Sequence, residues 1–315
     1  MSVWMMPGQG AQKVGMGADL LALPEVEETF ALATKATGID VVALTQTEDE
    51  TLINDALNSQ VLTASLSVGV ARALMARGVK PDAVVGFSLG QISGLMVTGI
   101  LSLGEGFALL NERARALAAA CEKRPGAMLA LLGATHEEAQ EACATCAEDD
   151  ILVCANYNAP GQVVVSGDVA AIDRVEAFWK EQSKRCARLR TAGAFHSPLM
   201  ADAAQQVGEF CKTLNFSDHA MPLWCNTDAQ HFEVAQAVDR LAAQVKSPVK
   251  FEQSIAALVE QGQTEFVEVG FGGVLTNLVK RIDRSSTRIK IGTFAEWEKA
   301  LSQLTTQANQ AGAQE

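Results

Sequence analysis

The run Ala83-Val84-Val85-Gly86-Phe87-Ser88-Leu89-Gly90-Gln91 joins an apolar segment directly to a serine that has a glycine two positions away on each side. Residues 83–85 predict a buried strand, and residues 89–96 predict a helix that begins just after the serine. The two glycines remove side chains that would clash in so sharp a strand-to-helix turn. Ordinary turns also contain this pattern, but the flanking strand and helix favour a nucleophile elbow, with the Ser88 hydroxyl at its tip.

The composition indicates a soluble globular protein with a large core. The chain has 315 residues, of which 48% are hydrophobic, and this length fits one large domain or a large domain that carries a smaller one. Its formal net charge of −12 argues against nucleic acid as a partner. No segment reaches the roughly 18 uninterrupted apolar residues of a membrane span. Seven scattered cysteines fit a reducing compartment, so we expect a cytoplasmic protein.

Strands and helices alternate on both sides of the elbow. Residues 1–7 are predicted as a buried strand, and helical spacing follows at residues 24–36, 51–76 and 103–123. Such alternation predicts an α/β fold, with parallel strands, right-handed crossovers and helices on both faces of the sheet.

The pattern changes after residue 126. The sequence predicts strands at 128–132, 151–156, 162–166 and 186–190, and helices at 137–147 and 169–183. This βαββαβ order is that of a ferredoxin-like unit, whose ends lie close together, so that it can be inserted into a larger domain. We expect a discontinuous large domain, residues 1–125 and 192–315, and an inserted ferredoxin-like subdomain, residues 126–191.

A serine nucleophile near neutral pH needs a base within hydrogen-bond reach, and the chain has four histidines. His136, His219 and His231 lie among polar residues and are predicted at the surface. His196 lies in a loop punctuated by glycine and proline, directly after the inserted unit, and is the candidate base. Nothing in the sequence indicates which third group would orient it.

Arg113 lies on the predicted helix at residues 103–123. Its planar guanidinium matches a carboxylate with two parallel hydrogen bonds, so it would suit a substrate that has a free carboxylate. An ion pair with Glu112 or another surface acid is the simpler interpretation from spacing alone.

Two other patterns give little support for further chemistry. Cys143 and Cys146 have the spacing of a metal or redox pair, but no second pair follows, so we predict no metal site. Phe271-Gly272-Gly273 lacks the lysine of a phosphate-binding loop, and nucleotide binding is not expected.

Basic residues form two clusters in an otherwise acidic chain. Either cluster could dock an acidic partner or a phosphate, or simply form a solvated helix face. The first contains Lys180, Lys184, Arg185, Arg188 and Arg190, and the second contains Lys280, Arg281 and Arg284.

Taken together, these motifs make the chain resemble the malonyl-CoA:acyl carrier protein transacylases over residues 4–291. The motifs that support the resemblance are Pro7-Gly8-Gln9-Gly10-Ala11-Gln12, Gly86-Phe87-Ser88-Leu89-Gly90, Arg113, Asn156 to Gly167, Gly193-Ala194-Phe195-His196-Ser197, Ser247-Pro248-Val249 and Glu268 to Leu275. The resemblance implies an α/β-hydrolase-like core with an inserted ferredoxin-like subdomain, which agrees with the predicted element order.

The resemblance also implies a role for each matching residue. Ser88 would be the acyl nucleophile, and His196 would act first as general base and then as general acid. Arg113 would bind the malonyl carboxylate. The backbone amides of Gln9 and Leu89 would form the oxyanion hole.

Two positions next to this site bear on acyl selectivity. Phe195 is similar to the residue of malonyl-selective relatives that crowds an α-branch. Phe87 stands where the family commonly has histidine, and Gln91 stands where it commonly has glutamate. These departures affect the expected acyl preference rather than the serine chemistry. Phe271 replaces a common proline, which we interpret as a loop variation.

The expected reaction is a ping-pong transfer of a malonyl group from malonyl-CoA to the phosphopantetheine thiol of acyl carrier protein, the step that starts fatty-acid chain elongation. It needs no cofactor, and malonyl-CoA is a substrate. We expect a monomer that docks the acidic carrier near Lys184, Arg185, Arg188 or Arg190. Open alternatives are a related transacylase of a malonate decarboxylase or polyketide pathway, a serine thioesterase or hydrolase, and a non-catalytic carrier-binding module.

Overall fold

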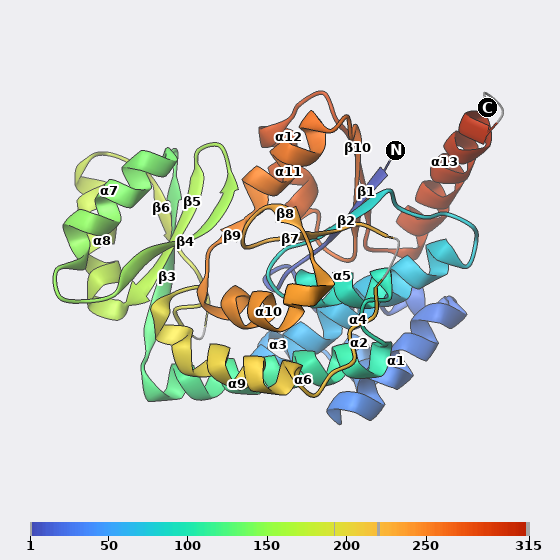
Figure 1. Ribbon diagram of the computed structural model, residues 1–315, viewed down its shortest axis with the longest axis horizontal. Helices are drawn as coiled ribbons and strands as arrows, with labels where there is room; N and C mark the ends of the chain where they lie inside the picture. Colours follow the sequence, from blue (N-terminus) through green and yellow to red (C-terminus); the bar gives the residue numbers. More distant parts are fainter. Residues whose placement is uncertain (1, 192, 219–220, 313–315) are drawn as a thin grey trace.

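Figure 1 shows the computed structural model, which describes residues 2–191, 193–218 and 221–312. Its larger sheet has the strand order β11-β10-β1-β2-β7-β8. All neighbouring pairs are parallel except β7 and β8, which confirms the predicted α/β class with a parallel sheet. The strands are β1 (Ser2–Met6), β2 (Ala83–Gly86), β7 (Leu223–Cys225), β8 (Gln230–His231), β10 (Glu265–Val269) and β11 (Thr287–Ile291).

Helices cover both faces of this sheet, as Figure 1 shows. Because successive side chains of a strand point to opposite faces, β1 contributes Trp4 and Met6 to one core and Val3 and Met5 to the other. The first core is shared with α1 (Pro24–Thr37), α4 (Ala56–Met75), α5 (Gly90–Thr98) and α6 (Leu103–Lys123), and the second with α11 (Phe251–Glu260) and α12 (Val274–Ile282). This burial on both faces explains the apolar runs of the central strands β1 and β2.

The smaller sheet has the order β6-β3-β5-β4-β9, and the elements that build its first four strands follow the predicted βαββαβ order. These elements are β3 (Gly126–Leu132), α7 (His136–Ala147), β4 (Leu152–Ala159), β5 (Gln162–Asp168), α8 (Val169–Glu181) and β6 (Cys186–Arg188). The two helices share one apolar core with the sheet. The fifth strand, β9 (Val249–Lys250), was not predicted, and it pairs in parallel with β4.

The remaining helices are α2 (Val41–Gln46), α3 (Glu50–Asn54), α9 (Ala201–Cys211), α10 (Ala237–Lys246) and α13 (Phe294–Gly312). The prediction of one helix over residues 51–76 was wrong, because the chain forms two helices there, α3 and α4. The Asp55 side chain accepts hydrogen bonds from the backbone N–H groups of Leu57 and Asn58 and so caps the start of α4. No helix in the described ranges is long and apolar enough to cross a membrane. His219 lies outside the described residues.

Candidate active site

The elbow has the predicted strand, turn and helix, and close packing explains its glycines. β2 ends at Gly86 and α5 begins at Gly90. A Cβ atom at Gly90 would lie 2.0 Å from the Met6 carbonyl oxygen, and one at Gly86 would lie 2.2 Å from the Gln91 backbone nitrogen. Ser88 itself has a φ of 53°, which is uncommon for a residue with a side chain and is held here by the surrounding packing.

His196 meets this serine although the two are far apart in the chain. Ser88 Oγ lies 2.8 Å from His196 Nε2. On the other side of the ring, Nδ1 lies 3.1 Å from the Gln244 carbonyl oxygen and 3.0 Å from the Ser247 carbonyl oxygen. Both of these groups can only accept, so Nδ1 bears the proton and Nε2 presents its lone pair to the serine hydroxyl. The orienting third group, which the sequence did not reveal, is therefore backbone rather than a carboxylate.

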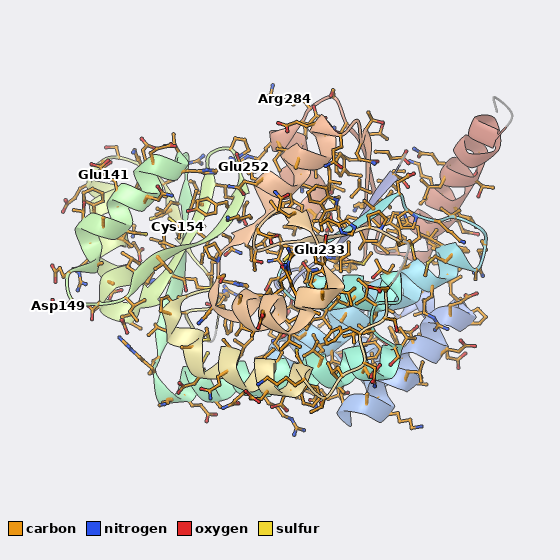
Figure 2. The ribbon with its side chains drawn as sticks, in the orientation of Figure 1. Glu141, Asp149, Cys154, Glu233, Glu252 and Arg284 are labelled. Atoms are coloured by element: carbon orange, nitrogen blue, oxygen red, sulfur yellow. The ribbon has the colours of Figure 1, made fainter. Side chains whose placement is uncertain are left out.

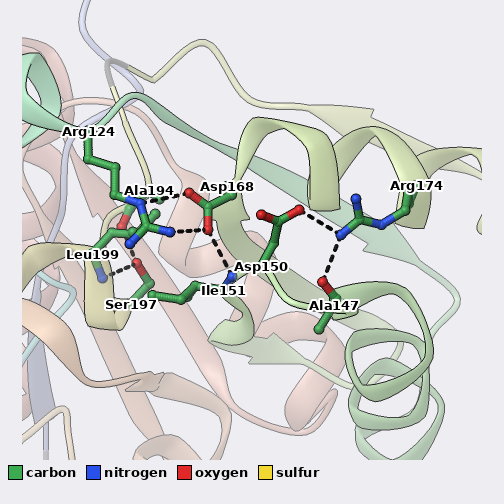
Figure 3. Close-up of polar contacts among 9 residues, drawn as sticks. All are labelled: Arg124, Ala147, Asp150, Ile151, Asp168, Arg174, Ala194, Ser197 and Leu199. Carbon is green, nitrogen blue, oxygen red and sulfur yellow. Dashed lines mark hydrogen bonds and ion pairs between the residues drawn. The ribbon is translucent and has the colours of Figure 1, made fainter.

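The loop that holds His196 is fixed by its own hydrogen bonds. Ser197 Oγ donates to the Ala194 carbonyl at 2.7 Å and accepts from the backbone N–H of Leu199 (Figure 3). Nearby, Arg124 at the end of α6 forms a two-pronged ion pair with Asp168 at the end of β5, at 2.9 and 2.7 Å. These contacts anchor the chain where it enters and leaves the smaller sheet.

Burial sets the charge state of His196. The residue is 4% exposed, and this desolvation, with the neighbouring Arg113 cation, lowers the pKa of His196 to about 4. Its hydrogen bonds to the two carbonyl groups oppose this effect only in part. The imidazole is therefore neutral near pH 7 and can accept the serine proton.

Arg113 is a buried cation that reaches the same hydroxyl. Its Nη2 donates to Ser88 Oγ at 3.2 Å and its Nη1 donates to Gln60 Oε1 at 2.9 Å. Burial lowers the pKa of Arg113 to about 10, so it stays charged at neutral pH. The expected alternative of an ion pair with Glu112 was wrong, because Arg113 forms no ion pair with any described residue, and its Nε has no hydrogen-bond partner among them. A buried charge without a counterion favours an anionic ligand. Gln60 had no signal in the sequence.

The two backbone groups expected in an oxyanion hole flank Ser88. Leu89 directly follows it, and Gln9 lies in the loop after β1, whose Gly8 packs against the Phe87 carbonyl group. Within the described part of the chain, the N–H groups of Gln9 and Leu89 have no acceptor, so both can donate to a ligand.

A cavity of about 340 Å³ is lined by Gln9, Ser88 and His196, and a larger one of about 620 Å³ adjoins it between the two sheets. Phe87 and Phe195 line the smaller cavity beside Ser88 and His196. The Phe87 ring packs edge-on against Phe251, with 5.5 Å between ring centroids, so it supplies an apolar wall.

The four basic residues expected to dock a carrier do not form one surface. Arg188 and Arg190 line the larger cavity, whereas Lys184 pairs with Glu138 at 2.9 Å on the helical face of the smaller sheet. Arg185 is exposed and lines neither cavity. Of the four, only Arg188 and Arg190 therefore border the cleft, and docking of a carrier at any of them stays a prediction.

The other residues considered from sequence lie away from Ser88. His136, predicted at the surface, is half-buried and lies 3.0 Å from Glu252 of α11, whereas His231 is exposed as predicted. Cys143 and Cys146 pack in the core of the smaller sheet with Cys154, which is labelled in Figure 2. Among the described residues, no group of three or more acidic, histidine or cysteine side chains could hold a metal ion.

Comparisons with known proteins agree with this geometry. The sequence matches the acyl transferase domain family over residues 3–314. It is 34% identical over 304 residues to the malonyl CoA-acyl carrier protein transacylase of Salmonella typhimurium, covering 95% of this chain and 98% of that protein. The crystal structure of malonyl-CoA:acyl carrier protein transacylase from Xanthomonas oryzae superposes with a TM-score of 0.92 at 37% identity, covering 96% of this chain and 97% of that one.

A further solved structure is a malonyl-transacylase in complex with its type II PKS acyl-carrier protein. It matches with a TM-score of 0.91 at 30% identity, covering 96% of this chain and 99% of that one. The chain therefore belongs to the acyl transferase domain family and, within it, to the malonyl-CoA:acyl carrier protein transacylases.

Proposed function

We propose that this enzyme transfers a malonyl group from malonyl-CoA to acyl carrier protein through a malonyl ester on Ser88, and so starts fatty-acid chain elongation. The main support is one juxtaposition: Ser88 Oγ lies within 3.2 Å of both a neutral imidazole and a buried guanidinium that has no counterion among the described residues. A base activates the nucleophile, and the cation selects an acyl group that ends in a carboxylate. The names of the relatives point to the same reaction.

In the first half-reaction, Ser88 Oγ attacks the thioester carbonyl carbon while His196 Nε2 takes the hydroxyl proton. The N–H groups of Gln9 and Leu89 stabilise the resulting oxyanion, and Arg113 holds the malonyl carboxylate. The intermediate collapses, the carbon–sulfur bond breaks, and the CoA thiolate leaves with the proton from His196.

In the second half-reaction, the phosphopantetheine thiol of the carrier gives its proton to His196 and attacks the malonyl ester. Collapse breaks the bond to Ser88 Oγ, which recovers the proton. Every proton and electron pair is accounted for by these groups, so the proposed chemistry uses no metal or organic cofactor. Phe195 and Phe87 would limit the acyl group by their bulk in the smaller cavity.

We propose the matching domain division: an α/β-hydrolase-like domain of residues 1–125 and 192–315, and a ferredoxin-like subdomain of residues 126–191. The βαββαβ order and the antiparallel pairing of β3 with β5 and β6 support it. The parallel strand β9 would then be a contribution of the large domain to the smaller sheet.

We also propose that the carrier docks at the mouth of the cleft, beside Arg190. This side chain is exposed, lines both cavities and forms no ion pair within the described ranges, whereas Arg188 is already paired with Asp173 and Glu176. The proposed cytoplasmic location is supported by seven cysteines that are all free thiols. Action as a monomer is supported by a site built from one chain.

A transfer assay tests this function. The enzyme is incubated with malonyl-CoA in the presence and absence of holo acyl carrier protein, and free CoA and malonyl-carrier are measured. A transacylase releases one equivalent of CoA without an acceptor and turns over only when the carrier is added. Continuous CoA release without an acceptor would instead identify a thioesterase, and no release at all would indicate a non-catalytic binding module.

A further inference from the structure

Behind the elbow lies a set of three buried amide side chains, Gln91, Asn226 and Gln244, which the proposed reaction does not use directly. Gln244 on α10 contacts both catalytic groups: its Nε2 donates to the Ser88 carbonyl oxygen at 2.7 Å, and its backbone carbonyl accepts from His196 Nδ1 at 3.1 Å. Gln244 as a whole is 2% exposed. One residue thus fixes the backbone that presents the hydroxyl and one acceptor that orients the imidazole.

Both groups that Gln244 contacts are in strained backbone conformations. Ser88 has a φ of 53° and His196 has a φ of 58°. Such conformations are unfavourable for residues with a side chain and persist only where the surroundings determine them. At Ser88, the carbonyl oxygen accepts from the Gln91 backbone N–H at 3.0 Å as well as from Gln244. Loss of the Gln244 donor would therefore relax the elbow.

The hydrogen bonds continue from Gln244 back to the elbow helix. Gln244 Nε2 also lies 3.4 Å from Asn226 Oδ1, and the Asn226 backbone N–H donates to Gln91 Oε1 at 3.0 Å. Asn226 and Gln91 are at most 1% exposed. The Asn226 carbonyl accepts from the Lys250 N–H at 2.7 Å, which ties the set to β9. The set therefore joins α5, α10 and the strand that links the two sheets.

The amide orientations follow from these partners. Gln91 must present its oxygen to the Asn226 N–H, and Asn226 must present its oxygen to Gln244. This leaves Gln91 Nε2 and Asn226 Nδ2 as buried donors without an acceptor among the described residues. Two unmet donors are costly in a core, which argues that the arrangement is kept for position rather than for stability.

We infer that Gln91, Asn226 and the Gln244 side chain act as positioning residues, which hold the Ser88 backbone in register with His196. They touch neither the acyl group nor the reacting atoms. Their loss should lower the rate of acylation and leave the affinity for malonyl-CoA unchanged, since misplacement of a nucleophile by about 1 Å can cost up to about a hundredfold in rate. The inference rests on the proposed acylation of Ser88.

The test is the pre-steady-state burst of CoA release, measured against malonyl-CoA concentration at pH 8. Gln244→Met keeps the side-chain length but removes the donor, and Gln91→Met removes the acceptor for Asn226. We expect each to lower the maximal burst rate constant at least about tenfold, with the half-saturating concentration within twofold of wild type. Gln91→Glu keeps an acceptor for the Asn226 backbone N–H, so its burst rate constant should stay much closer to that of wild type than the rate constant of Gln91→Met does.

Thr98→Val is the matched control, because it removes a buried hydrogen bond from the same helix α5, from Thr98 Oγ1 to the Gly94 carbonyl. It should lower the melting temperature and leave the burst rate constant within twofold of wild type. Burst rates of Gln244→Met and Gln91→Met that equal wild type, or a Thr98→Val rate as low as theirs, would overturn the inference. A wild-type enzyme that shows no burst would overturn the proposed function itself.

Discussion

Replacement of Arg113 by methionine tests how the site selects its acyl group. Methionine keeps much of the side-chain volume, so a large cavity is avoided, but it removes the cation that faces Ser88. Acetyl-CoA has no carboxylate for Arg113 to bind. We therefore expect Arg113→Met to lose activity with malonyl-CoA far more than with acetyl-CoA, and the ratio of the two kcat/KM values reports the carboxylate contact alone.

The geometry sets the size of the effect. Arg113 uses one N–H on Ser88 Oγ and one on Gln60 Oε1, which leaves three of its five N–H groups for a carboxylate. Two charge-assisted hydrogen bonds at about 1.5–3 kcal/mol each give roughly 3–6 kcal/mol. At about 1.4 kcal/mol for each tenfold, the malonyl-to-acetyl ratio of kcat/KM should fall by roughly 10²–10⁴.

The assay compares acyl transfer from both thioesters by wild type, Arg113→Met and Arg113→Lys. Lysine keeps the charge but not the planar fork, so its ratio should lie between the other two. Loss of the Ser88 contact affects both substrates and cancels in the ratio. A ratio within threefold of wild type in Arg113→Met would refute the reasoning, because the carboxylate would then be bound elsewhere.

Three further predictions follow from distances and charge. In Gly90→Ala the new methyl group would lie 2.0 Å from the Met6 carbonyl oxygen, so the Tm of thermal unfolding should fall by several degrees. In the control Gly104→Ala the methyl group meets no heavy atom within 4 Å, so the protein should be stabilised by about 0.4–1 kcal/mol, and equal shifts in the two variants would contradict the packing explanation. Because the pKa of His196 is lowered to about 4, the imidazole stays neutral well below pH 7 and can still accept a proton there. We therefore expect kcat/KM to stay nearly constant down to about pH 5 and to fall only below that pH, whereas a fall centred near pH 6.5 would show that the pKa of His196 is not lowered. With saturating malonyl-CoA, Arg190→Glu should raise the KM for acyl carrier protein by about three- to tenfold at low salt, and an unchanged KM would exclude docking at that side chain.

Sequence reasoning succeeded where the determinants are local. The elbow is built from neighbouring segments of the chain: a strand, two glycines around Ser88 and the start of a helix. A Cβ atom at position 86 or 90 would clash with backbone atoms, so only glycine fits there. The βαββαβ order could likewise be predicted, because each strand and helix shows the spacing of apolar residues that is typical of its type.

The residues that contact Arg113, Ser88 and His196 could not be predicted, because tertiary packing brings them to the site. Gln60 and Gln244 reach the site from α4 and α10, and nothing in their flanking sequence distinguishes them from surface glutamines. His196 is oriented by carbonyl oxygens of Gln244 and Ser247, and a backbone group has no side-chain identity to read. The strand β9 has two residues, which is too short for a recognisable period.

Charge clusters were misleading for a related reason. Neighbouring basic residues in a strand point to opposite faces, and a partner from another element can neutralise them. Lys184 lies over the Trp179 ring and pairs with Glu138, and Arg188 pairs with Glu176, so only part of the cluster is available at the cleft. Arg113 shows the converse: its spacing alone favoured a surface ion pair, but the residue is buried and forms no ion pair with any described residue.

The central claim is that Ser88 accepts the malonyl group with His196 as its base. Intact-mass spectrometry and peptide mapping after brief exposure to malonyl-CoA, without carrier, test it most directly. We predict an adduct of one malonyl group on Ser88 in wild type, none in Ser88→Ala, and a strongly slowed one in His196→Ala. An adduct on another residue, or one that forms equally fast in Ser88→Ala, would contradict the account.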